Sequence, residues 1–142
     1  MDAIACKHVE RVVIGLCTCR RPQMLWRCLI SLGKQSVDAS IDPTIVVIDN
    51  EESPNNQRIV EAFERLSPFP VFYWHEPRRG IAVARNAILD VAVELGADWI
   101  AMLDDDEIAE PGWLAALMAD EYRDVPVLQG RNEFIYPDNM PF

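Results

Sequence analysis

The fold of this chain is decided by the stretch Val12-Val13-Ile14-Gly15-Leu16-Cys17 and by the pair Arg21-Pro22 that follows it. A short apolar run rich in β-branched side chains is typical of a strand buried on both faces. Proline is favoured in the first turn of a helix, so Arg21-Pro22 marks a helix start. Apolar residues then recur at helical spacing, at Leu25, Cys28, Leu29 and Leu32. The stretch therefore predicts a strand joined to a helix.

The same pattern recurs in the middle of the chain. Residues 44–49 predict a second strand, and Ser53-Pro54 supplies the cap and first turn of a second helix. The apolar positions of that helix are Ile59, Phe63 and Leu66. Residues 70–74 predict a third, shorter strand, and a long helix then runs from Gly80 to Gly96. Its apolar face carries Ile81, Ala84, Ile88, Val91 and Leu95.

The C-terminal part repeats the unit once more. Residues 98–103 predict a fourth strand, which runs directly into the tetrad Asp104-Asp105-Asp106-Glu107. A short helix follows Pro111, with apolar positions Leu114, Leu117 and Met118. Residues 125–129 predict a fifth strand, placed at an edge because Pro126 cannot donate a ladder hydrogen bond. Residues 130–137 are expected to form a further strand.

Strands that alternate with helices predict an α/β fold, with a mostly parallel sheet and helices on both faces. A chain of 142 residues fits a single domain, here residues 1–142. The formal net charge of -10 argues against nucleic acid as a partner, because phosphates need a basic surface. Arg20-Arg21 and Arg78-Arg79 can still act locally on a phosphate. We find no transmembrane segment or secretory signal, and we expect a cytoplasmic protein.

The cysteines and histidines do not form a strong metal motif. Cys17-x-Cys19 with Cys28 lacks the paired spacing of structural zinc sites, so reduced core thiols are the expected state. His8 and His75 each stand alone and are expected to be surface or packing residues.

Polar residues follow each predicted strand, at the sheet edge where open parallel sheets bind ligands. These groups are Thr18-Cys19-Arg20-Arg21, Asp49-Asn50-Glu51, Arg78-Arg79-Gly80 and the acidic tetrad. Asp49 can accept hydrogen bonds from a nucleoside, or it can cap a helix. The arginines of residues 78–86 suit a phosphate or a base edge, or they can simply be solvated.

The tetrad places four carboxylates together, which repel one another unless a cation lies among them. A solvated acidic turn is the alternative interpretation. In extended geometry Asp104 and Asp106 point to the same side, and Asp105 points elsewhere. Hard oxygen donors favour Mg²⁺ or Mn²⁺ over zinc.

Four ordered motifs resemble those of family 2 glycosyltransferases with the GT-A fold, over about residues 10 to 120. They are residues 13–22 (VIGLCTCRRP), 45–50 (IVVIDN), 80–86 (GIAVARN) and 102–107 (MLDDDE). The resemblance implies a Rossmann-like half that binds a nucleoside diphosphate sugar, most readily a UDP-sugar. It also implies transfer of the sugar to a saccharide or lipid-linked acceptor hydroxyl, as in surface polysaccharide synthesis, and association of the full-length protein with a membrane.

The resemblance also assigns roles to particular residues. Asp49 would contact the nucleoside, and Thr18 and Arg20 would border the same nucleotide. Arg85 would lie near the base and phosphates. Asp104 and Asp106 match the outer members of the Asp-x-Asp motif, where Asp106 would contact the metal and Asp104 would contact the metal or ribose. Asp105 is grouped with the nucleotide-sugar-binding residues and Glu107 with the supporting ones.

A Mg²⁺ or Mn²⁺ ion at Asp106 would neutralise charge on the departing diphosphate. Inverting members also need a carboxylate base beyond the Asp-x-Asp motif, and no late carboxylate matches it, so the catalytic base is unassigned. We therefore expect a donor-binding part that stops before the acceptor half. A non-catalytic nucleotide-binding module is one alternative. A nucleotidyltransferase-like protein is another, although residues 18–22 lack the glycines of its first loop.

Overall fold

The computed structural model describes residues 8–135. The strands are β1 (Glu10–Thr18), β2 (Ile41–Asp49), β3 (Val71–His75) and β4 (Trp99–Met102). The helices are α1 (Pro22–Leu32), α2 (Gln57–Glu64), α3 (Ile81–Glu94), α4 (Trp113–Leu117) and the short 3₁₀ helix η1 (Asp120–Tyr122). The first four predicted strands and all four predicted helices are therefore present.

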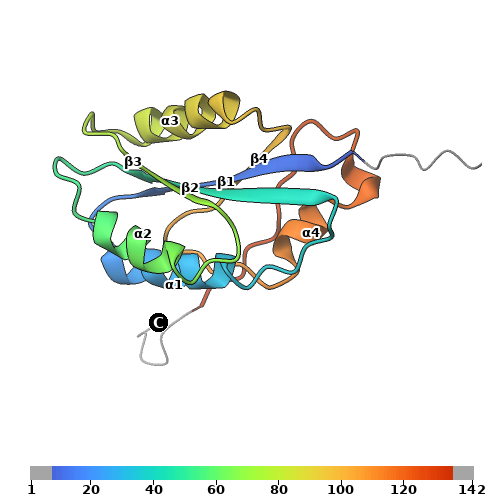
Figure 1. The fold of residues 1–142 in the computed structure, drawn as a ribbon, viewed down its shortest axis with the longest axis horizontal. Coiled ribbons are helices and arrows are strands. Elements are labelled where there is room, and N and C mark those ends of the chain that lie inside the picture. Colours follow the sequence, from blue (N-terminus) through green and yellow to red (C-terminus); the bar gives the residue numbers. More distant parts are fainter. Residues whose placement is uncertain (1–7, 136–142) are drawn as a thin grey trace, which may run out of the picture.

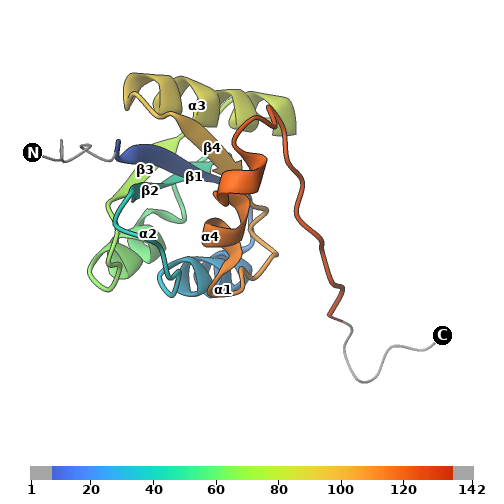
Figure 2. The same ribbon diagram turned by 90° about the vertical axis from the view of Figure 1, so that its right-hand side faces the viewer.

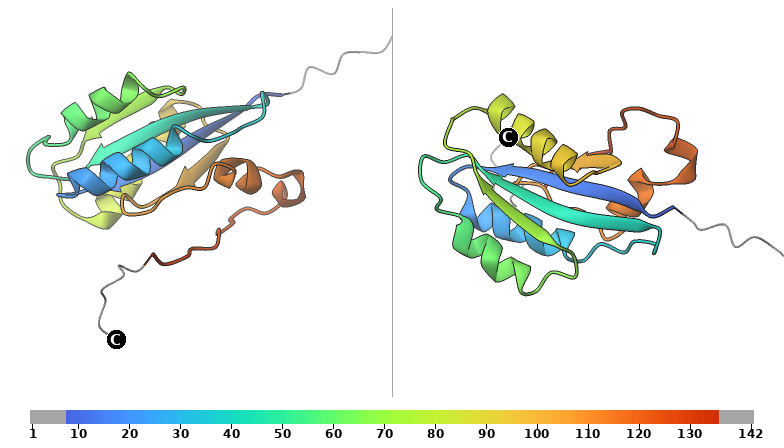
Figure 3. Two further views of the ribbon diagram at one scale, coloured as in Figure 1. Left: turned by 90° about the horizontal axis from the view of Figure 1, so that it is seen from below. Right: turned by 45° about the horizontal axis from the view of Figure 1, so that its top comes forward.

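The strands form one sheet in the order β3-β2-β1-β4, and every neighbouring pair is parallel. Helix α3 covers one face, and α1, α2 and α4 cover the other (Figure 1). Seen from below, α1 and α2 lie side by side across the sheet (Figure 3). The predicted α/β fold, a parallel sheet with helices on both faces, is confirmed. No helix within the described residues combines the length and apolar character required to span a bilayer.

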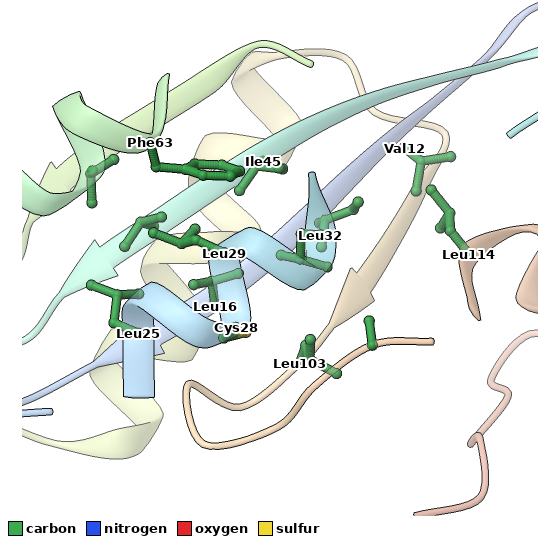
Figure 4. Packing of buried hydrophobic residues seen from close by; sticks show 14 residues of the cluster. Val12, Leu16, Leu25, Cys28, Leu29, Leu32, Ile45, Phe63, Leu103 and Leu114 are labelled. Carbon is green, nitrogen blue, oxygen red and sulfur yellow. The ribbon is translucent and has the colours of Figure 1, made fainter. Parts of the chain in front are cut away.

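The core has one cluster on each face of the sheet. Leu25 and Leu29 of α1 and Phe63 of α2 pack on Leu16 and Ile45 of the sheet (Figure 4). On the opposite face, a smaller cluster joins the sheet to α3 and contains Val13, Val46, Ile48, Ala84 and Ile88. Burial on both faces explains why β1 and β2 read as continuous apolar runs rather than as alternating ones.

Gly15 allows α3 to lie close to β1. A Cβ atom built on Gly15 would lie 2.2 Å from Ile88 Cγ2, which is far inside van der Waals contact. A side chain at this position would therefore push α3 away from the sheet. This close approach matters because α3 also carries Arg85.

The predicted secondary structure was wrong in two regions. Helix α2 begins at Gln57 rather than at Ser53-Pro54, because the preceding loop binds the carboxylates of Asp49 and Glu51 instead of starting a helix. Its buried residues are Val60 and Phe63, whereas Leu66 is 66% exposed.

The predicted strand at residues 125–129 is also absent, and the described part of the strand predicted at 130–137 is irregular. Proline at 126 removes a ladder donor, and the segment runs past the free edge of β4 and away from the body of the protein (Figure 2). Residues 136–137 of that predicted strand lie outside the described part of the chain. The structure has free thiols at Cys17, Cys19 and Cys28, as predicted, and Cys6 lies outside the described residues.

Candidate functional site

The strand order brings the carboxyl ends of β1, β2 and β4 together. Thr18 stands opposite Asp49 in the register of β1 and β2. On the other side of β1, the Leu103 N–H donates to the Gly15 carbonyl over 3.2 Å, which places the acidic tetrad beside the end of β1. The predicted groups after these strands are therefore neighbours in space, although up to 87 residues separate them in the chain.

The acidic tetrad forms a turn rather than an extended segment. Residues Asp105 and Asp106 lie in the turn, and the Glu107 N–H donates to the Asp104 carbonyl over 3.0 Å. The Glu107 carboxylate accepts a hydrogen bond from the Asp104 N–H. The expectation of extended geometry at Asp104 and Asp106 was therefore wrong, because the local hydrogen bonds close a turn.

Asp105 points into the protein and is only 5% exposed. Thr18 Oγ1 donates to Asp105 Oδ2 over 2.8 Å, and Arg21 Nη1 donates to Asp105 Oδ1 over 3.2 Å. Burial raises the pKa of the Asp105 carboxyl, and the Thr18 hydrogen bond and the Arg21 charge oppose that effect. Asp105 thus fastens the acidic turn to the loop after β1.

The other two aspartates face arginines at the surface. Arg21 Nη1 lies 2.9 Å from Asp106 Oδ2, and Arg85 Nη2 lies 3.3 Å from Asp104 Oδ1. About half of each of these side chains is exposed. Exposed ion pairs contribute only about 0–1 kcal/mol, so a ligand of higher charge can replace either contact.

Asp49 is fully buried, with an exposed fraction of 0%. Asp49 Oδ2 accepts hydrogen bonds from the Asn56 N–H over 3.0 Å and from the Tyr73 hydroxyl over 2.8 Å. Asn56 Nδ2 donates to Asp49 Oδ1 over 3.2 Å. Asn56 precedes the first residue of α2, so Asp49 holds the start of this helix. A nucleoside can reach the carboxylate only if Tyr73 or Asn56 moves.

Glu51 organises the loop after β1 and was given no role from the sequence. Glu51 Oε1 accepts from the Arg20 N–H over 2.6 Å and from Asn56 Nδ2, and Oε2 accepts from Asn55. Burial alone would raise the pKa of Glu51, but these hydrogen bonds lower it below its usual value. Arg20 has a φ of 57°, a strained conformation for a residue with a side chain. The adjacent Asn55-Asn56 pair is the only sequence signal of this role.

Asn50 ties the loop before α3 to the same edge. Asn50 Nδ2 donates to the carbonyls of Glu76 and Arg78, and Asn50 Oδ1 accepts from the Gly80 N–H over 3.0 Å. Arg78, a predicted phosphate candidate, lies with Nη2 2.7 Å from Glu76 Oε2. Arg85 is therefore the arginine of residues 78–86 that the structure brings to the acidic turn.

A hollow of about 360 Å³ lies beside β4, between that strand and the C-terminal segment. Its walls include Trp99, Met102, Tyr122 and Leu128. Glu107 is the one residue of the tetrad that lines it. The hollow therefore adjoins the acidic turn without containing Asp49, Arg85 or Asp104.

The oxygen donors of the acidic turn fit a divalent cation that is bound together with a diphosphate. Within residues 8–135, no three or more His, Cys, Asp or Glu side chains gather as a ready metal site. Mg²⁺ in nucleotide sites commonly takes one or two protein carboxylates, with water and substrate phosphates as its other ligands. Asp104 and Asp106, which are partly exposed at one turn, supply donors of that kind.

Comparison with known proteins identifies the family of this chain. Residues 13–137 match the family described as glycosyl transferase family 2. The succinoglycan biosynthesis protein ExoM of Rhizobium meliloti (strain 1021) is 36% identical over 111 residues, which cover 78% of this chain and 34% of that protein. The chain thus spans about a third of the length of this relative.

Two solved structures share the fold. The mannosyltransferase PcManGT from Pyrobaculum calidifontis, in complex with GDP-Man and Mn²⁺, superposes with a TM-score of 0.65 at 20% identity, covering 80% of this chain and 34% of that one. Residues 1–349 of S. aureus TarS, in complex with UDP, superpose with a TM-score of 0.61 at 21% identity, covering 80% and 33%.

Proposed function

Because this chain belongs to glycosyl transferase family 2, we propose that its site binds the nucleoside diphosphate part of a sugar donor with a divalent cation. The sugar would pass to the hydroxyl of a saccharide or lipid-linked acceptor during polysaccharide synthesis. The relative named for succinoglycan biosynthesis supports the polysaccharide context. Neighbours solved with UDP, UDP-GlcNAc and GDP-Man support a nucleotide-sugar donor.

The observation that carries the proposal is the meeting of Thr18, Asp49, Arg85 and the acidic turn at one edge of a parallel sheet. This edge combines carboxylates for a cation with a guanidinium for a phosphate or base. A solvated acidic turn would not need the buried bond between Thr18 and Asp105. The location also follows the general rule for ligands of open α/β sheets.

Each residue has a distinct proposed task. Asp106 and Asp104 would hold a Mg²⁺ or Mn²⁺ ion, which when bound neutralises charge on the diphosphate as the bond to the sugar breaks. Arg85, released from Asp104, would donate hydrogen bonds to the phosphates or base. Thr18 and Asp105 would fix the turn in place, and Arg20 would border the nucleotide. Asp49 would contact the nucleoside after a partner moves. We assign no catalytic base within the described residues.

Calorimetry of UDP binding with Mn²⁺ and with chelator tests this function. We expect UDP to bind at least about ten-fold more tightly with Mn²⁺, because a cation held by Asp106 would neutralise charge on the diphosphate. Asp106→Asn should remove most of this difference, and Asp120→Asn, at an exposed site on η1, is the matched control. Equal binding in metal and chelator, or no binding of UDP or GDP in either, would reject the proposed metal-dependent donor site.

A further inference from the structure

Arg21 lies where it can couple the binding of the cation to the binding of the diphosphate. Its Nη1 atom donates both to Asp105 Oδ1 and to Asp106 Oδ2, over 3.2 and 2.9 Å. Arg21 precedes Pro22, the first residue of α1, so its backbone is fixed by the start of that helix. The guanidinium therefore acts as a built-in counter-cation for the acidic turn.

The two contacts of Arg21 differ in how easily they can be broken. The Asp105 side chain is 6% exposed and is also held by Thr18, so this partner is fixed. The Asp106 side chain is 47% exposed, and an exposed ion pair is weak. A ligand can therefore take Asp106 from Arg21 while Asp105 retains the guanidinium at the site.

The free-energy cost of breaking the ion pair between Arg21 and Asp106 depends on which groups bind at the site. A free divalent cation would displace the guanidinium from Asp106 and then lie beside its positive charge, with no anion to compensate. A diphosphate that binds together with the cation would supply oxygen acceptors for the Arg21 N–H groups that no longer donate to Asp106. The guanidinium thus opposes the cation alone and favours the cation together with the diphosphate.

We propose that Arg21 is a positioning residue that competes with a free divalent cation for Asp106 and transfers to the diphosphate when a nucleotide binds. This inference rests on the proposed function. Nucleotide and cation would then bind cooperatively, and by linkage each would raise the affinity for the other by the same factor. The protein would resist loading with metal alone and would accept a metal–nucleotide pair.

The test measures three affinities in the full chain: Mn²⁺ alone by electron paramagnetic resonance, UDP in chelator, and UDP with Mn²⁺. In Arg21→Gln we expect Mn²⁺ alone to bind about two- to five-fold more tightly, the size expected for loss of one half-exposed ion pair. UDP with Mn²⁺ should bind more weakly, because the diphosphate loses the N–H donors of Arg21, whereas UDP in chelator should change less, so the coupling factor falls. Arg65→Gln, at the far end of α2, removes the same charge and should change none of these values.

The possible outcomes distinguish a failure of the proposed role of Arg21 from a failure of the proposed donor site. If UDP binds with Mn²⁺ but Arg21→Gln leaves Mn²⁺ affinity and coupling unchanged, the role of Arg21 is refuted and the donor site stands. If the wild-type chain binds no UDP with Mn²⁺, both fail. Should circular dichroism show that Arg21→Gln is unfolded, Arg21→Lys decides, because it keeps the positive charge that opposes Mn²⁺ alone. Coupling should then stay close to the wild-type value, and its loss in a folded Arg21→Lys variant would overturn the proposal.

Discussion

At the scale of single residues, the two carboxylates at the end of β2 and just beyond it, Asp49 and Glu51, have different roles in the protein. Asp49 is buried beneath Tyr73 and Asn56, whereas Glu51 holds the backbone of Arg20. The sequence indicated Asp49 because it ends an apolar strand. It gave little sign of Glu51, because the geometry that makes Glu51 important comes from a loop 31 residues earlier in the chain.

The pair Asp49→Asn and Tyr73→Phe separates a nucleoside contact from a purely structural role. Tyr73→Phe removes one donor to Asp49 and leaves the carboxylate in place. If Asp49 contacts the nucleoside, Asp49→Asn should weaken UDP binding by about ten-fold or more, because a buried recognition bond is lost. Tyr73→Phe should preserve or strengthen binding. Equal stability losses with unchanged UDP affinity in both variants would show that Asp49 is structural.

Glu51 should make the stability of the protein depend on acid. Its pKa is lowered in the folded state, so its contribution is present above the unfolded pKa of about 4.3 and is lost as pH falls through the lower folded value. Glu51→Gln also places an amide NH₂ group, itself a donor, opposite the N–H groups that donate to the Glu51 carboxylate. We expect a loss of about 1–3 kcal/mol in the free energy of unfolding at pH 7 and a flatter profile below pH 5.

Urea unfolding at pH 7 and at pH 3.5 measures this effect. Glu52→Gln, at the exposed neighbouring position, is the matched control and should change neither value by more than about 0.5 kcal/mol. Parallel pH profiles for wild type and Glu51→Gln would contradict the assignment of Glu51.

At the scale of elements, the distance between β1 and α3 is set by the missing side chain at Gly15. Gly15→Ala should cost about 1–3 kcal/mol of stability through overpacking against Ile88. It should also weaken UDP binding, because α3 carries Arg85 toward the acidic turn. Thermal or urea unfolding and the UDP titration measure the two effects.

A double-mutant cycle with Ile88→Ala checks the cause. Removing Ile88 Cγ2 makes room for the new methyl group, so the two losses should not add. Strict additivity of the two stability losses would show that Gly15 acts through something other than its contact with α3.

The elements that sequence predicted best are those with burial on both faces, such as β1 and β2, because their apolar runs leave few alternatives. The start of α2 and the segment beside the edge strand β4 were harder to predict. The start of α2 depends on hydrogen bonds from its loop to Asp49 and Glu51, which no local pattern reveals. Residues 125–129 have an apolar, strand-like composition, but a strand also needs a partner and Pro126 weakens it.

At the scale of the whole molecule, the parallel order β3-β2-β1-β4 is what turns scattered motifs into one site. That convergence could be predicted from strand–helix alternation and the rule for open sheets. The inward direction of the Asp105 side chain could not, because it depends on Thr18 and Arg21, which bind Asp105 from 84 or more residues away. Sequence therefore predicted which residues meet more reliably than how each side chain points.

Amide chemical shifts during a titration with UDP and Mg²⁺ would show where on the protein the nucleotide binds. The largest changes should fall at Thr18, Asp49 to Glu51, Arg85 and Asp104 to Asp106, at the carboxyl ends of β1, β2 and β4. Changes confined to Trp99, Tyr122 and Leu128, around the hollow beside β4, would place the nucleotide elsewhere and contradict the account.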